Sequence, residues 1–356
     1  MPAAKTPTLP WRETPLLESS ALSRAAGCRV LLKLENLQPS GSFKSRGVGN
    51  YLLSQLAKAV QASGGDQDVP LHFYASSGGN AGLAAVHAAR SLNRPCTVVV
   101  PLSTKPLMIA KLRTAGAADV VQVGASWKEC DHHLRTEIVA KDPTGVYVPP
   151  FDHEDIWEGN STLATEIYQQ MPHGTRPPAA VVCSVGGGGL FSGVQIGLER
   201  VGWQDVPVLA LETEGAASLA ASLKANQLVT LPAITSQATS LGATRVAARA
   251  FEEAKKPNVR SVVLSDAEAA MGCWRLADDE RMLVEMACGI NVALCYDGKL
   301  EAVLGRKIEQ HEAVVIVLCG GSNVTLEMLN TWRQEFGAIE KVLPSKDVPS
   351  TQTAPT

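Results

Sequence analysis

Short apolar runs alternate along the chain with longer stretches in which apolar residues recur every three or four positions. The runs typical of buried strands cover residues 29–35, 71–75, 96–101, 118–124, 179–186, 206–213, 260–266 and 313–321. The stretches with helical spacing cover residues 47–63, 80–92, 105–116, 127–142, 190–202, 267–280 and 323–337. This alternation predicts an α/β protein whose mostly parallel sheets are covered by helices on both faces.

Length and composition narrow the class of protein. A chain of 356 residues is long for one compact core, so we expect two lobes. A net charge of −3 and an aromatic content of 5% argue against a nucleic-acid partner, which needs a basic surface or a stacking platform. No apolar run approaches the roughly 20 residues of a membrane helix, and the first residues lack the apolar segment of a secretory signal. We therefore expect a cytoplasmic protein without a membrane partner, with a mitochondrial location as the alternative.

The eight cysteines form no C-x-x-C pair, which argues against a zinc or thioredoxin-like site. Several of them lie in apolar runs, as Cys183 does in "AAVVCSV". We expect them to be small buried residues.

Three predicted strand-to-helix junctions are poor in large side chains: "ASSGGNAG" (75–82), "SVGGGGLFSG" (184–193) and "CGGSN" (319–323). Ligands of open α/β sheets bind where the carboxyl ends of strands meet the N-termini of helices. The first junction offers Ser76, Ser77 and Asn80 at a helix start, which suits a carboxylate. The alternative for these three residues is ordinary helix capping.

The second junction carries four consecutive glycines, Gly186, Gly187, Gly188 and Gly189. Their backbone N–H groups can converge on an anion at the start of a helix. The pattern is not a P-loop, because Val194 stands where that motif requires lysine, and it does not fit G-x-G-x-x-G in any register. A phosphate is therefore expected, without a nucleotide. The alternative is a tight turn that serves close packing.

One lysine, Lys44, lies among small residues in "PSGSFKSRGVGN" (39–50). A lysine that a ligand can approach closely is able to form a Schiff base with a carbonyl cofactor. Taken alone, Lys44 could equally be a solvated loop lysine. Together with a phosphate cradle and a carboxylate cradle, it suggests pyridoxal 5'-phosphate, which carries both an aldehyde and a phosphate.

The motifs "PSGSFKSRG", "SSGGNAG", "SVGGGGL" and "CGGSN", in this order, resemble those of the fold-type II pyridoxal-phosphate enzymes. The resemblance runs from about Thr14 to the 330s and is greatest to the catabolic L-serine/L-threonine dehydratases of fungal type. It implies two open, twisted, mostly parallel sheets in a tryptophan synthase β-like fold, and a homodimer. It further implies a large cofactor-binding domain (1–37 and 155–345) and a small substrate-side domain (38–154). The polar tail 346–356 is expected to be disordered.

The same resemblance implies roles for individual residues. Lys44 would be the Schiff-base lysine and catalytic base, and Phe43 would pack on the cofactor ring. Asn80 would bind the ring hydroxyl, the four glycines the phosphate, and Cys319 would face the pyridine nitrogen. The substrate carboxylate would lie among Ser77, Gly78 and Asn80. A monovalent cation, potassium, would be held by Glu212 and by carbonyl groups of Gly186, Ala216, Leu241 and Ala243. An ordinary strand-end carboxylate is the alternative for Glu212.

The implied reaction is β-elimination, which converts L-serine to pyruvate and L-threonine to 2-oxobutanoate, each with ammonia. Two positions depart from the family: Met286 stands where relatives often carry proline, and Gly78 where mammalian serine dehydratases usually carry alanine. The alternatives are a β-replacement enzyme similar to the cysteine synthases and a non-catalytic protein that binds pyridoxal phosphate. A biosynthetic threonine deaminase would need a regulatory domain, for which little chain remains past residue 340.

Overall fold

The computed structural model describes residues 9–171 and 176–342 and contains two sheets. The larger sheet has the order β1 (Leu16–Glu18), β2 (Arg29–Lys33), β10 (Ala313–Val317), β7 (Ala180–Ser184), β8 (Val208–Thr213) and β9 (Val259–Leu264). The smaller sheet has the order β5 (Asp119–Gln122), β4 (Cys96–Val100), β3 (His72–Ala75) and β6 (Gly145–Val148). Among these ten strands of the described residues, only β1 pairs with its neighbour in antiparallel direction. The predicted α/β fold with two mostly parallel sheets is confirmed.

Strand β10 lies in the interior of the larger sheet, between β2 and β7. All five of its residues are buried. This explains its continuous apolar sequence, because a parallel strand that is covered on both faces has no solvent-facing positions. The register aligns Val314 with Val30 on one side and Ala180 on the other. The carboxyl ends of β10 and β7 therefore lie side by side, which brings the loops that follow them to the same edge of the sheet.

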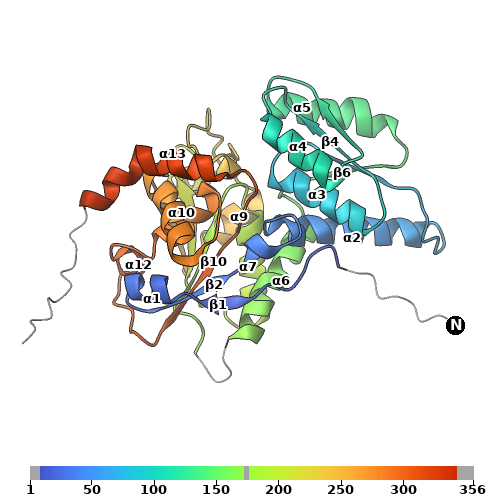
Figure 1. Cartoon of the computed structure of the whole chain (residues 1–356). Coiled ribbons are helices and arrows are strands. Elements are labelled where there is room, and N and C mark those ends of the chain that lie inside the picture. The colour runs from blue at the N-terminus through green and yellow to red at the C-terminus, as the bar shows by residue number, and fades with distance from the viewer. Residues whose placement is uncertain (1–8, 172–175, 343–356) are drawn as a thin grey trace, which may run out of the picture.

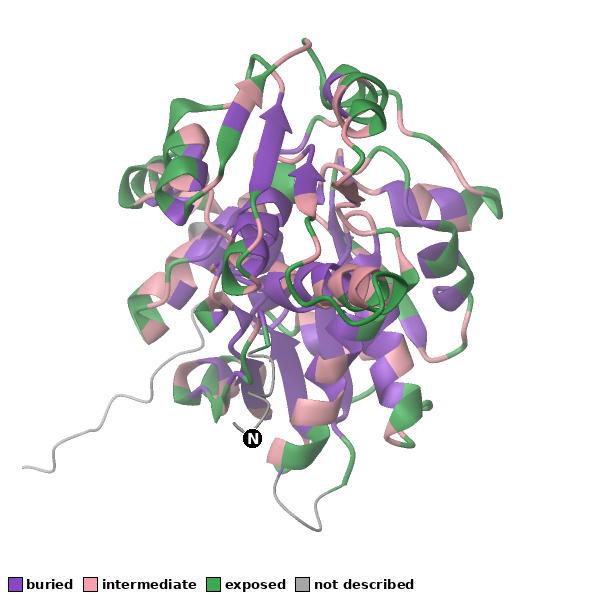
Figure 2. Cartoon of the chain, turned by 90° about the vertical axis from the view of Figure 1, so that its right-hand side faces the viewer, coloured by how far each residue is buried: buried purple, intermediate pink, exposed green. Residues whose placement is uncertain are grey.

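Helices cover both sheets. They are α1 (Ser20–Ala26), α2 (Lys44–Ala62), α3 (Asn80–Ser91), α4 (Pro106–Ala115), α5 (Trp127–His133), α6 (Glu154–Gln170), α7 (Gly189–Arg200), α8 (Ser218–Ala225), α9 (Ala248–Glu253), α10 (Asp266–Glu280), α11 (Met286–Ala293), α12 (Lys299–Leu304) and α13 (Leu326–Phe336). Figure 1 shows α3, α4 and α5 around strands β4 and β6 at the upper right, with α1, α10, α12 and α13 at the left. Buried residues gather on the strands and on the inner helices, and exposed residues lie at the periphery (Figure 2).

Helix α6 contributes to both hydrophobic cores and packs against α2. Leu52 of α2 and Ile156 of α6 belong to the core of the smaller sheet, whereas Ile167 of α6 belongs to that of the larger sheet. The two helices pack closely: a Cβ atom on Gly159 would lie 2.4 Å from the carbonyl oxygen of Arg46. Since α6 contributes to both cores, the exact domain boundaries given above stay a prediction.

Several elements differ from the sequence-based expectation. Helix α2 begins at Lys44 instead of residue 47, and α13 begins at Leu326 instead of 323, because the Thr325 hydroxyl accepts the N–H of Met328 as an N-cap. The expected helix 127–142 is regular only as far as His133 and continues as a π-helical turn. The expected tail 346–356 lies outside the described residues.

All eight cysteines are buried free thiols, as expected: Cys28, Cys96, Cys130, Cys183, Cys273, Cys288, Cys295 and Cys319. Within residues 9–171 and 176–342, no helix combines the length and the apolarity that crossing a bilayer requires.

Candidate active site

The loops of three sequence motifs contact one another directly. The N–H of Phe43 donates to the carbonyl oxygen of Cys319 at 3.1 Å, and the N–H of Gly321 donates to that of Gly41 at 2.9 Å. The side-chain oxygen of Asn80 accepts the N–H of Ser322 at 2.9 Å. Segments that lie far apart in the sequence thus form one site, because β2 and β10 are neighbours in the larger sheet and Asn80 joins them from the smaller one.

Lys44 is the first residue of helix α2 and is half-buried, which differs from a solvated loop lysine. Its Nζ donates to the carbonyl oxygen of Pro150 at 2.5 Å and lies 5.4 Å and 5.9 Å from the ring centroids of Phe43 and Phe151. Burial lowers the pKa of Lys44 to about 8, because the apolar surroundings disfavour the charged amine. The neutral, nucleophilic form of this amine is therefore far more populated near neutral pH than in an ordinary lysine.

Phe151 connects Lys44 to the glycine loop. A Cβ atom on Gly187 would lie 2.3 Å from Cγ of Phe151, and one on Gly189 would lie 2.6 Å from the Phe151 carbonyl oxygen. Gly188 has a φ of +91°, and its Cβ would lie 2.3 Å from that of Ala250. Close packing therefore explains the glycines at these three positions, which is the alternative that the sequence left open.

The same loop also offers hydrogen-bond donors. Among the described residues, the backbone N–H groups of Gly186, Gly187 and Gly188 donate no hydrogen bond, and helix α7 begins directly after them. Free N–H groups at the start of a helix suit an anion. The residues present thus fit a phosphate group.

The loop after β3 holds the residues expected around the substrate carboxylate. A Cβ atom on Gly82 would lie 1.8 Å from the Ser77 carbonyl oxygen, so glycine is required there for the loop to pack on helix α3. Ser77 accepts the N–H of Gly79 through its hydroxyl at 3.3 Å. Ser76 is buried and donates to Asp131 at 2.6 Å, so its hydroxyl is committed to holding the loop.

Gly78 in this loop has little free space beside it. A Cβ atom there would lie 2.9 Å from Cγ2 of Thr104 and 3.2 Å from Cγ1 of Val100.

Cys319 lies two residues after the end of strand β10 and is 5% exposed. Its Sγ lies 3.5 Å from the hydroxyl oxygen of Ser184, at the end of the neighbouring strand β7, and 3.7 Å from the carbonyl oxygen of Ala287. The thiol thus stands beside the start of the glycine loop, while the carbonyl group of Cys319 accepts the backbone N–H of Phe43.

Glu212, the expected cation ligand, is fully buried at the end of β8. Its two oxygens accept the N–H groups of Leu219 and Ala220, each at 2.8 Å, at the start of helix α8. Burial raises the pKa of Glu212 to about 7, although these two hydrogen bonds favour the ionised form.

Three further members of the expected cation site, Gly186, Leu241 and Ala243, lie close together. The Cβ of a residue at Gly186 would approach the Leu241 Cα to 3.1 Å. The N–H of Ala243 donates to the Leu241 carbonyl oxygen at 2.8 Å, and Ala216 follows Glu212 in the turn before α8.

Sequence reasoning missed three contributors: Pro150, Phe151 and Glu285. The first two follow strand β6, whose short sequence "GVYV" (145–148) gave no clear strand signal. Recognising that strand would have placed "PPFDH" at a sheet edge with the other loops. Glu285 directly precedes Met286, which was compared with the family, but its role could not be read from the sequence because its contacts come from three distant segments.

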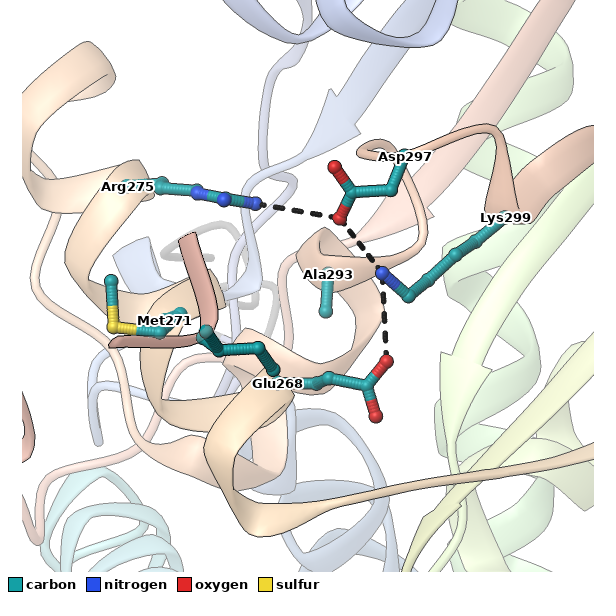
Figure 3. A pocket seen from close by; sticks show the side chains of 7 residues that line it. Glu268, Met271, Arg275, Ala293, Asp297 and Lys299 are labelled. Atoms are coloured by element: carbon teal, nitrogen blue, oxygen red, sulfur yellow. Dashed lines mark hydrogen bonds and ion pairs between the residues drawn. The ribbon is translucent and has the colours of Figure 1, made fainter. Parts of the chain in front are cut away.

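A cavity elsewhere is too small to be the site. It measures about 20 Å³ and lies beside α10 and α12, lined by Glu268, Met271, Arg275, Ala293, Asp297, Lys299 and Ile339. Ion pairs of Asp297 with Arg275 and Lys299, and of Lys299 with Glu268, close it (Figure 3). Such a volume holds about one water molecule.

Comparison with known proteins agrees with this geometry. Residues 7–320 match the family described as "Pyridoxal-phosphate dependent enzyme". The chain is 46% identical to "Serine dehydratase-like" of Rattus norvegicus (91% of this chain, 94% of the relative) and 43% identical to "L-serine dehydratase/L-threonine deaminase" of Bos taurus (91% and 95%). A solved L-serine ammonia-lyase from the fungus Rhizomucor miehei is similar with a TM-score of 0.82 and 35% identity, covering 92% of this chain and 99% of that one. The chain belongs to the pyridoxal-phosphate dependent enzymes.

Proposed function

We propose that this protein is an L-serine and L-threonine ammonia-lyase that acts in amino-acid catabolism. The names of the bovine and fungal relatives support this assignment. The observation that carries it is the convergence of Lys44, the glycine loop and Asn80 on one site. Each of these features taken alone would not indicate a function.

The residues of this chain suit the polar groups of pyridoxal phosphate. Lys44 would bind the aldehyde carbon, and the free N–H groups of Gly186, Gly187 and Gly188, with Gly189, would hold the phosphate. Phe43 would pack on the ring, Asn80 would bind the ring hydroxyl, and Cys319 would face the ring nitrogen. When bound, this cofactor withdraws electrons from the α-carbon of the amino acid.

Lys44 would also move the proton of the reaction. With an amino acid held at the cofactor, Lys44 Nζ would take the α-proton, because its lowered pKa leaves more of this amine in the neutral form that can accept a proton near pH 7. The substrate carboxylate would lie at the N-terminus of α3, near Ser77 and Gly78. Loss of the α-proton and the β-hydroxyl releases one water, and hydrolysis of the enamine product takes one up. The net products are the 2-oxo acid and ammonia.

We further infer that a monovalent cation, potassium, supports the larger lobe through Glu212. One carboxylate with several carbonyl groups suits a hard cation. A homodimer is inferred from the family resemblance in the same way.

A coupled assay tests the function. Pyruvate should form from L-serine and 2-oxobutanoate from L-threonine, each with equimolar ammonia, and Lys44→Ala should abolish both. Borohydride should fix the cofactor to a peptide containing Lys44. No 2-oxo acid from either substrate, with cysteine formed from O-acetylserine and sulfide, would instead indicate β-replacement. Neither product from a protein loaded with cofactor would indicate a non-catalytic binding protein.

A further inference from the structure

A buried carboxylate, Glu285, lies at the centre of the site without a role in the scheme above. It is 4% exposed and directly precedes helix α11. Its Oε1 accepts the side-chain N–H of Asn80 at 2.9 Å and the backbone N–H of Asn323 at 2.7 Å, and its Oε2 accepts the Ser240 hydroxyl. One side chain thus links α3, the loop after β10 and the segment around Ser240.

These contacts fix the orientation of the Asn80 amide. The amide oxygen accepts the backbone N–H of Ser322, and one of the two amide N–H groups donates to Glu285. A rotated amide would place its oxygen against the carboxylate and its NH₂ against the N–H of Ser322. Both contacts would be repulsive, so the network permits a single orientation.

One hydrogen of the Asn80 amide remains available. Apart from Glu285, the amide nitrogen lies near only the Ser240 hydroxyl among the described residues, at 3.4 Å. This distance is long for an N–H···O hydrogen bond. Asn80 can therefore offer an N–H, and not its carbonyl, to a further acceptor.

We propose that Glu285 is a positioning residue that makes Asn80 a hydrogen-bond donor to the ring hydroxyl oxygen of the cofactor. The inference rests on the role of Asn80 proposed above. A donated N–H favours the ionised hydroxyl, whereas a carbonyl oxygen in the same place would oppose it. Glu285 would thereby control the ionisation of the ring hydroxyl without contacting the cofactor.

The isosteric variant Glu285→Gln tests the proposal in the enzyme loaded with pyridoxal phosphate and without substrate. Glutamine can face Asn80 with either its N–H or its oxygen, so only the N–H of Ser322 still enforces the amide orientation. The visible absorption band, which reports the ionised hydroxyl bound to the lysine imine, should shift in part to the near ultraviolet. The dissociation constant of pyridoxal phosphate should rise about tenfold, as expected for one hydrogen bond to the charged cofactor.

A double-mutant cycle separates positioning from a structural role. In the Asn80→Ala background, Glu285→Gln should change neither the spectrum nor the affinity further, because its intermediary is already absent. Ser240→Ala is the matched control: it removes the partner of the other carboxylate oxygen and should leave the spectrum unchanged.

Two outcomes would overturn the proposal: a wild-type spectrum and affinity in Glu285→Gln, or additive losses in the double variant. If Glu285→Gln does not fold, Glu285→Asp provides the second measurement. The shortened carboxylate should give the same spectral shift to a smaller extent, and an unshifted spectrum would again count against the proposal. Because these readouts need no substrate, they are independent of whether the enzyme forms pyruvate.

Discussion

At the scale of single residues, the role proposed for Lys44 predicts that its lowered pKa sets the pH dependence of cofactor uptake. Only the neutral amine attacks an aldehyde, so the rate of cofactor capture should rise with pH until it levels off above about 8, the pKa of Lys44. The initial rate of appearance of the visible band, recorded after pyridoxal phosphate is added at pH 6 to 10, checks this. A midpoint near 10.5, the value of an unperturbed lysine, would show that burial does not act on this amine.

Gly78 should decide the stereochemistry. Racemisation needs a second acid or base on the cofactor face opposite Lys44, and a positioned group contributes roughly 10²-fold or more over solvent. Glycine supplies none, so L-serine should give pyruvate without D-serine.

The variants at this position form a matched pair. Gly78→Ser adds a hydroxyl and should yield some D-serine, whereas Gly78→Ala adds only the Cβ, which would press on Thr104, and should yield none. Chiral chromatography of both reaction mixtures is the measurement. Formation of D-serine by the wild-type enzyme at a rate comparable to that of pyruvate would refute the prediction that Gly78 prevents racemisation.

At the scale of elements, a buried ion network holds the start of helix α2. The Arg46 guanidinium, two residues after Lys44, contacts both oxygens of Glu35 (2.7 and 2.8 Å) and both oxygens of Glu166 (2.5 and 2.7 Å). Lys33 donates to Glu166 as well, so the two positive and two negative charges balance. Such a network ties the segment around Lys44 to helix α6 and to the segment after β2.

Replacing Arg46 should therefore weaken the fold. Arg46→Met leaves Glu35 without its buried cation, and we expect a loss of about 3–5 kcal/mol in the free energy of unfolding. Arg46→Lys keeps the charge but loses the bidentate hydrogen bonds, so its loss of unfolding free energy should be smaller. Urea unfolding of both variants provides the measurement. Equal stability of Arg46→Met and wild type would mean that the network contributes nothing net.

Local patterns predicted the strands well and the site only in part. "CTVVV" and "AVVIV" are strands because an apolar run buried on both faces is a strong signal. The start of α2 was missed, because Ser and Gly around Phe43 read as a loop while tertiary contacts extend the helix to Lys44. Contacts such as that of Asn80 with Glu285 join residues 205 positions apart and leave no trace in a local window.

At the scale of the whole molecule, a bound cation should stabilise the larger lobe. Binding to the native state alone adds about 1.4 kcal/mol when the cation is present at ten times its dissociation constant. Thermal unfolding in potassium chloride should therefore occur at higher temperature than in tetramethylammonium chloride of equal ionic strength. Glu212→Gln should remove that difference. Identical midpoints for the wild type in the two salts would argue against the site.

Because all eight thiols are buried, the rate at which they react with a labelling reagent reports how often the fold opens. A folded molecule should consume almost no alkylating reagent, so the slow labelling that does occur counts excursions from the native state. Cys96 and Cys130 pack with the smaller sheet and the other six with the larger, so mass spectrometry of labelled peptides resolves the two lobes. The native cysteines can therefore show, without an engineered probe, which lobe opens first. Repeating the labelling with cofactor bound shows which lobe the cofactor stabilises.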